Sequence, residues 1–194
     1  MIRQLCFKAM KLTGWKFVNN VPDSLRSFIL LGAPHTSNYD FFPAMALSWL
    51  MKRNAKFVIK NDWMKFPFNL FMGPLGAHGI EREKANRVEK ISNTETMANF
   101  FKEFSELVLM ITPEGTRKAT RKWKTGFFYV AQKAQVPIVL GFADYEKKIA
   151  GLGPIIYPSN FEKDMAAILK FYSTIKGKNP SKFLLDERYS SLTL

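Results

Sequence analysis

Cysteine and histidine are scarce in this chain of 194 residues, which has one Cys and two His. One cysteine cannot form an internal disulfide, and three such side chains are too few for a tetrahedral zinc site. We therefore expect no disulfide and no metal centre. The composition is compatible with a reducing compartment, and we expect a cytoplasmic protein.

Long apolar runs are also missing. Lys, Arg, Asn or Pro interrupts each run before it reaches the ~20 residues of a spanning helix, so we expect a protein that is not integral to a membrane. The first 15 residues lack the long apolar centre of a signal peptide, because Lys8 and Lys11 divide them. Residues 2–15 suit an amphipathic helix, which could be an interfacial anchor or an ordinary helix packed on the core.

Acidic residues are few beside basic ones: 29 Lys and Arg against 16 Asp and Glu give a formal net charge of +13. Such a field attracts partners that carry phosphate, whether nucleic acid, anionic lipid or an acidic cofactor. The 18 Phe, 4 Trp and 9 Met favour a partner that is also apolar. We therefore expect peripheral association with an anionic membrane surface, on its inner face, in preference to nucleic acid.

Apolar runs short enough for buried strands alternate with helical patterns. We expect strands within 27–32, 56–60, 107–111, 136–143 and 153–157, and helices within 38–52, 93–104, 124–134 and 161–175. This order predicts a single α/β domain over 1–194, a sandwich with a largely parallel or mixed central sheet flanked by helices. Ligands of such sheets gather at the carboxyl ends of strands, so the loops after strands are where a site is expected.

The loop after the first of these strands, APHTSNYDFF, places four residues between His35 and Asp40. If Ser37 caps the next helix, Asp40 stands where a capping box has it accept from the Ser37 amide. The same carboxylate can instead hold the His35 ring in the tautomer whose other nitrogen is a free base. The loop alone leaves both roles open. Since no Gly-x-Ser-x-Gly nucleophile occurs, such a base would act on a substrate hydroxyl, which suits acyl transfer.

The loop after the strand at 107–111 reads PEGTR, residues 113–117. Its glycine lets backbone amides approach a ligand, and Arg117 can bind phosphate through two N–H groups. Arg82 and Lys124 add positive charge, although a turn and a solvated basic face would also explain these residues. The VPIV run at 136–139 is most simply the start of a buried strand, and it could also form the apolar wall of an acyl-chain groove.

Together these segments resemble the four blocks of the glycerolipid acyltransferase family, typified by lysophosphatidic acid acyltransferase. His35 and Asp40 match its His-x4-Asp block, and 79–82, 113–117 and 136–139 match the second to fourth, so the blocks span 35–139. The resemblance implies that His35 is the general base and that Asp40 orients it. It also implies binding of the substrate by Arg82, Glu114, Gly115, Thr116, Arg117, Lys124 and Pro137.

The resemblance further implies the reaction, a transferase step of phospholipid biosynthesis. The hydroxyl of a lysophospholipid, foremost 1-acyl-glycerol 3-phosphate, would attack the thioester of acyl-CoA or acyl-carrier protein directly, with no metal and no further cofactor. Glu81 stands where the second block often has aspartate, and a GAHG stretch replaces its usual more apolar lead-in, so the acceptor pocket is expected to differ.

Other interpretations of the sequence stay open. The chain could be an acyltransferase of the same superfamily that acts on another lipid acceptor. It could also be a non-enzymatic module that binds nucleic acid or anionic lipid. Residues 61–74, NDWMKFPFNLFMGP, combine aromatic side chains with a lysine. They are the preferred interfacial patch, with a buried helix-turn segment as the alternative.

Overall fold

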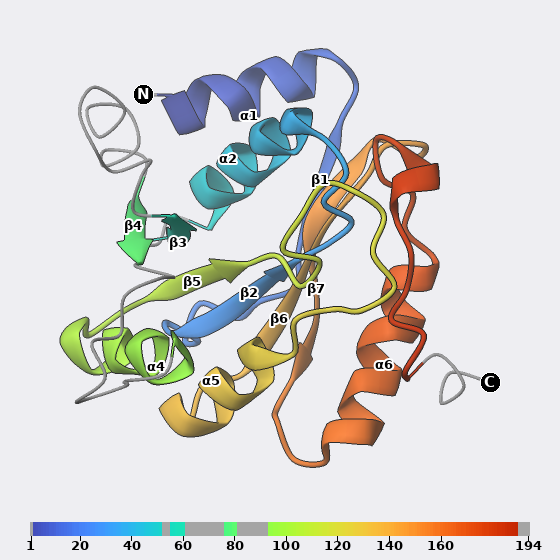
Figure 1. Ribbon diagram of the computed structural model, residues 1–194. Helices are drawn as coiled ribbons and strands as arrows, with labels where there is room; N and C mark the ends of the chain where they lie inside the picture. Colours follow the sequence, from blue (N-terminus) through green and yellow to red (C-terminus); the bar gives the residue numbers. More distant parts are fainter. Residues whose placement is uncertain (1, 52–54, 61–75, 81–92, 190–194) are drawn as a thin grey trace.

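A computed structural model describes residues 2–51, 55–60, 76–80 and 93–189. Seven strands in these ranges form one sheet in the order β1-β7-β6-β2-β5-β3-β4 (Figure 1). The strands are β1 (Lys16–Asn19), β2 (Phe28–Gly32), β3 (Ala55–Lys60), β4 (Ala77–Ile80), β5 (Val108–Ile111), β6 (Ile138–Asp144) and β7 (Ile149–Ile156). Neighbouring strands are parallel except β6 and β7, which are antiparallel. The predicted α/β fold with a mixed, largely parallel sheet is confirmed.

Helices cover both faces of the sheet because its central strand is apolar at successive positions. Ile29 and Leu31 of β2 join a core with helices α4, α5 and α6 on one face. Phe28 and Leu30 point to the opposite face. There α1 packs against α2 (Figure 1). The helices are α1 (Ile2–Leu12), α2 (Phe41–Leu50), α4 (Asn93–Glu103), α5 (Gly126–Ala134) and α6 (Phe161–Ser173), with the short η1 (Asn38–Asp40) and η3 (Pro180–Lys182).

Several element boundaries differ from those predicted. The strand expected at 153–157 begins at Ile149, and Lys148 ends the turn before it with a φ of +52°. The helix expected from 124 begins at Gly126, and the Lys124 amide before it donates to the Pro113 carbonyl at 2.7 Å. The sequence did not predict β1, a mostly exposed strand of four residues. It also placed β4 in a loop.

The amino-terminal helix has one packed face and one open face. Cys6 of α1 is buried in a small core with Met45 of α2. Ile2, Leu5 and Leu12 stay exposed, at 44, 64 and 89%. The structure thus shows helix packing on the inner face and leaves apolar side chains available on the outer one. Among the helices that the structure describes, none has both the length and the apolar character needed to cross a bilayer.

After α6 the chain runs back along that helix, as the red trace in Figure 1 shows. The ring of Tyr189 packs against that of Phe161 at the start of α6, with centroids 5.2 Å apart. On the way, residues 176–179 contact the loops at the carboxyl ends of β2 and β6. The Lys176 carbonyl accepts from the Tyr145 amide at 2.9 Å, and Asn179 bonds Thr36 through two bonds of 3.0 and 3.1 Å.

The end of this returning segment fixes the loop that follows β5. Asp186 is fully buried, and its Oδ2 accepts from the Trp123 amide at 2.9 Å and from Arg188 at 2.6 Å. Arg188 also donates to the Trp123 carbonyl at 2.7 Å. Burial alone would raise the pKa of Asp186, but the bonds from Arg188 and the Trp123 amide outweigh it and lower the pKa. Trp123 immediately precedes Lys124, so this contact sets the end of the PEGTR loop.

Asp186→Ala is expected to lower the free energy of unfolding by roughly 2–3 kcal/mol, since it leaves a buried amide without its charged acceptor. Glu187→Ala is the matched control, because its ion pair with Arg121 is exposed and its loss should cost less than about 1 kcal/mol. Urea denaturation of both variants measures the difference. Equal, small losses would contradict a structural role for Asp186.

Candidate active site

Three neighbouring parallel strands bring the candidate residues to one edge of the sheet. β2 pairs in parallel with β6 on one side and with β5 on the other. His35 follows the carboxyl end of β2, Glu114 follows that of β5, and Tyr145 directly follows that of β6. The loops after adjacent parallel strands therefore meet where open α/β sheets bind their ligands.

The Asp40 carboxylate caps the short helix that follows the His35 loop. Its Oδ2 accepts from the amides of Thr36 and Ser37 at 2.8 and 2.9 Å. The Ser37 hydroxyl in turn accepts from the Tyr39 amide at 3.1 Å. The capping box predicted from the Ser37 and Asp40 spacing is confirmed, with η1 as the element that it opens.

The same carboxylate also faces the histidine. Asp40 Oδ2 lies 3.4 Å from His35 Nδ1, the distance of an ion pair and longer than a good hydrogen bond. Asp40 Oδ1 accepts from the Tyr145 hydroxyl at 2.9 Å. Burial alone would raise the pKa of Asp40, but the nearby His35 ring and the bonds from Ser37 and Tyr145 outweigh it and lower the pKa. The sequence left two roles open for Asp40, capping the helix and holding His35. In the structure, Oδ2 accepts from the capped amides and also faces the His35 ring.

Glu114 lies beneath the His35 loop. Its side chain is buried, and its Oε1 accepts from the His35 amide at 2.7 Å. Oε2 is buried and has no hydrogen-bond partner within the described part of the chain. Burial raises the pKa of Glu114 to about 7, against the opposing effect of the His35 amide bond. Glu114, which the resemblance predicts to bind substrate, therefore contacts the backbone of His35, the candidate base.

The rest of the PEGTR loop turns outward, toward solvent. Gly115 has a φ of +62°, a conformation that glycine adopts without strain, and an added Cβ would lie 2.9 Å from Cε of Lys124. Lys124 and Arg117 are exposed, while the Thr116 hydroxyl accepts from the Lys118 amide at 3.2 Å. The structure thus brings Lys124 back over Gly115, and both cations remain open to an anionic ligand.

Two predicted substrate-binding residues are not part of this cluster. Pro137 is buried just before β6, and its carbonyl accepts from the Ile29 amide near the start of β2. It therefore lies at the sheet edge opposite His35, as expected of the residue that begins a parallel strand. Arg82, like the interfacial patch predicted at 61–74, lies outside the described residues.

The sequence interpretation missed residues that lie in other loops and contact the His35 loop. Tyr145 could have been found, because it follows a predicted strand just as His35 and Glu114 do. Asn179 and Gly177 carry no such signal. An added Cβ at Gly177 would lie 2.9 Å from Pro34 and 3.1 Å from Thr36, so only a glycine lets this segment approach the loop so closely.

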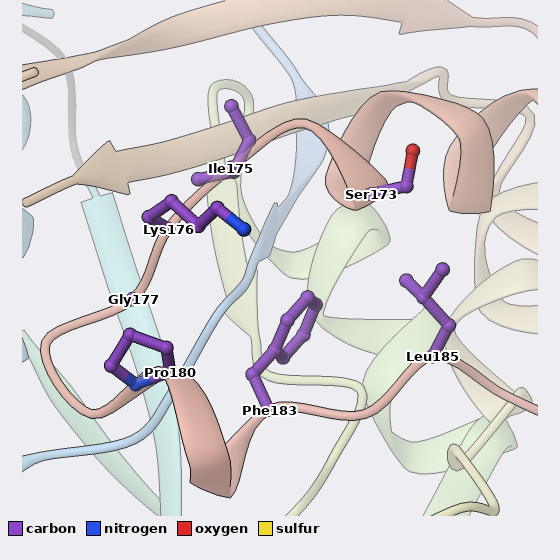
Figure 2. Close-up of a pocket in the computed structure, with 7 residues that line it drawn as sticks. All are labelled: Ser173, Ile175, Lys176, Gly177, Pro180, Phe183 and Leu185. Carbon is purple, nitrogen blue, oxygen red and sulfur yellow. The ribbon is translucent and has the colours of Figure 1, made fainter. Parts of the chain in front are cut away.

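Two hollows lie beside the carboxyl-terminal segment. One of about 200 Å³ is formed between the end of α6 and η3, as Figure 2 shows. It is lined by Ser173, Ile175, Lys176, Gly177, Pro180, Phe183 and Leu185. A second, more open hollow of about 460 Å³ includes Tyr145 and Lys178 in its lining. Neither of these two hollows is lined by His35 or Asp40.

Comparison with known proteins assigns the family. Residues 16–139, more than half of the chain, match the sequence profile of the acyltransferase family, and this stretch includes all four blocks. The chain belongs to the acyltransferase family, which confirms the family predicted from the blocks. A search among curated proteins returns no significant match.

Among solved structures, the chain is similar to the crystal structure of the 1-acyl-sn-glycerophosphate (LPA) acyltransferase PlsC from Thermotoga maritima. The TM-score is 0.53 and the sequence identity 16%, over 82% of this chain and 69% of that one. At this identity the likeness concerns the fold.

Glu114→Gln is expected to remove a pH dependence of stability. The folded protein binds a proton at Glu114 up to about pH 7, whereas the ordinary pKa is 4.5. The stability contributed by this proton is therefore full below pH 4.5 and is lost as the pH rises through 7. Relative to the variant, the unfolding free energy should fall by roughly 3 kcal/mol over this range. Denaturant titrations of both proteins at several pH values measure this, and parallel curves would refute it.

Proposed function

We propose that this acyltransferase moves a fatty acyl group from a thioester donor to the free hydroxyl of a lysophospholipid, with 1-acyl-glycerol 3-phosphate as the foremost acceptor. The donor is acyl-CoA or acyl-carrier protein. The observation that carries the proposal is His35 Nδ1 facing the Asp40 carboxylate at the carboxyl edge of the sheet. This arrangement leaves Nε2 of the imidazole for a substrate hydroxyl.

The reaction needs no nucleophile from the protein. His35 Nε2 accepts the hydroxyl proton while the acceptor oxygen attacks the thioester carbonyl. The tetrahedral intermediate collapses as the C–S bond breaks, and the thiolate takes the proton that His35 holds. Asp40 keeps the ring oriented and stabilises the imidazolium that forms between these two proton transfers.

The basic side chains of the PEGTR loop suit the phosphate of the acceptor. Arg117 offers paired N–H donors, and the Lys124 side chain stands beside the open backbone of Gly115. We propose that these two cations, with Arg82, hold the phosphate while His35 meets the hydroxyl. The net charge of +13 would draw anionic lipid toward the protein.

We further propose that α1 and α2 form the side that meets the membrane, on its inner face. Leu5 and Leu12 of α1 are exposed, and so are Phe42 and Trp49 of α2. Lys8 and Lys11 accompany them on α1 and are also exposed. Apolar side chains flanked by cations are what binding to an anionic bilayer surface requires.

An assay for thiol release tests the proposed reaction. The purified protein is incubated with acyl-CoA or acyl-carrier-protein thioesters and with a panel of lysolipids and other lipid acceptors. We expect turnover that is highest with a phosphate-bearing lysolipid. Absence of turnover with every pair would refute the function, and a preference for another lipid would correct the acceptor.

His35→Ala should lower kcat by about 1,000-fold or more, because general base catalysis is lost. Its unfolding midpoint and its binding to vesicles should stay nearly unchanged, since the described contact of the ring is with Asp40. A non-enzymatic module would behave differently. It would bind DNA or RNA with a steep salt dependence that survives His35→Ala, and it would release no thiol.

Replacing Leu5 and Leu12 together with Glu should weaken binding to anionic phospholipid vesicles by at least about tenfold, because both apolar contact and charge attraction are lost. Tyr157→Glu is the control for added charge alone, since Tyr157 is 67% exposed in the loop before α6, and its single negative charge should cost at most about half of the charge effect of the double variant. Vesicle flotation measures both. Equal binding by the parent and the Leu5 and Leu12 variant would place the membrane surface elsewhere.

A further inference from the structure

We propose that Tyr145 is a positioning residue of the acyl-transfer site, which acts by holding the Asp40 carboxylate in the plane from which Oδ2 faces His35. The inference rests on the proposed function and adds a residue from outside the four sequence blocks. It comes from one contact, the 2.9 Å bond from the Tyr145 hydroxyl to Asp40 Oδ1, made across 105 positions of the chain.

The division of donors between the two carboxylate oxygens shows why a third anchor matters. Oδ2 receives both backbone amides, from Thr36 and Ser37, and is also the oxygen near His35. The two amide bonds to Oδ2 already limit rotation of the carboxylate about the Cβ–Cγ bond, and a bond to Oδ1 limits the small rotations that remain. Among the described contacts, Tyr145 supplies the donor to Oδ1. Fixing both oxygens sets the plane of the group and therefore the direction of Oδ2 toward the imidazole.

Tyr145 is itself held rigidly, as a positioning residue must be. It directly follows β6, the strand beside β2, and its amide donates to the Lys176 carbonyl at 2.9 Å. Its ring meets Trp15 edge to face, with centroids 5.1 Å apart and planes at 90°. These contacts come from the amino-terminal part of the chain and from the segment after α6, so residues outside the His35 loop hold the phenol.

The phenol stays a hydrogen-bond donor in this environment. Burial raises the pKa of Tyr145, and the charge of Asp40 and the bond to it raise the pKa further. Among the described residues, Lys178 faces the ring, with its Nζ 5.6 Å from the ring centroid. A protonated phenol pointing at a carboxylate accepts no proton from the substrate, so the residue acts through Asp40.

Tyr145→Phe tests the proposal because it removes the hydroxyl and keeps the ring that packs on Trp15. We expect kcat to fall about tenfold, with the KM values for donor and acceptor nearly unchanged, since the variant disturbs the orientation of the base. In an Asp40→Asn background the same change should have little further effect on kcat. The matched control is Tyr157→Phe, which removes a hydroxyl from an exposed tyrosine and should leave kcat unchanged. Equal losses with and without Asp40 would overturn the proposal.

A second measurement is independent of turnover. The chain has two histidines, so ¹⁵N NMR of the imidazole rings can be assigned with His35→Ala. In the parent the neutral form of the His35 ring should carry its proton on Nδ1, the nitrogen that faces Asp40. Tyr145→Phe should shift a substantial fraction of the rings to the tautomer with the proton on Nε2. An unchanged tautomer would refute the positioning role, whereas a changed tautomer without any turnover would refute the acyl-transfer function alone.

Discussion

Four contacts meet on the carboxylate of Asp40, and the candidate site depends on them. Two amides of the His35 loop and the Tyr145 hydroxyl donate to it, and His35 Nδ1 faces it at 3.4 Å. A carboxylate that satisfies backbone amides cannot move far without leaving buried donors unpaired. The bonds that fold the loop therefore also hold the carboxylate that faces His35. In the proposed mechanism the same carboxylate orients the base.

The surrounding fold keeps that anion in place from several directions. The loops after β6, β2 and β5 converge because these strands are parallel neighbours. The His35 amide donates to the Glu114 carboxylate, and Asn179, in the segment after α6, donates to the Thr36 carbonyl. None of these contacts is local in sequence. Short loops that a buried sheet brings together thus hold His35 and Asp40, the residues that we propose as the base and its orienting partner.

The sequence predicted those parts of the fold that short runs of neighbouring residues determine. Successive apolar positions identified β2, β5 and β6 because each strand is buried between helices, and the Ser37 and Asp40 spacing predicted the cap. The motif blocks likewise predicted the family. The place of Tyr145 after a predicted strand could have marked it as a site candidate. The contacts that Tyr145 and Asn179 make could not be predicted, since they join loops more than 100 positions apart. Pro137 was assigned to substrate on resemblance, whereas the parallel register sets it at the opposite sheet edge.

The rate of Asp40→Asn, compared with its stability, tests most directly the claim that one carboxylate both caps the helix and orients the base. Asparagine has the same shape and can still accept from the backbone amides, but it carries no charge. We predict that kcat falls by at least about 100-fold while the free energy of unfolding falls by only about 1 kcal/mol. Loss of stability with an unchanged kcat would show that Asp40 serves the fold alone and that another group orients His35.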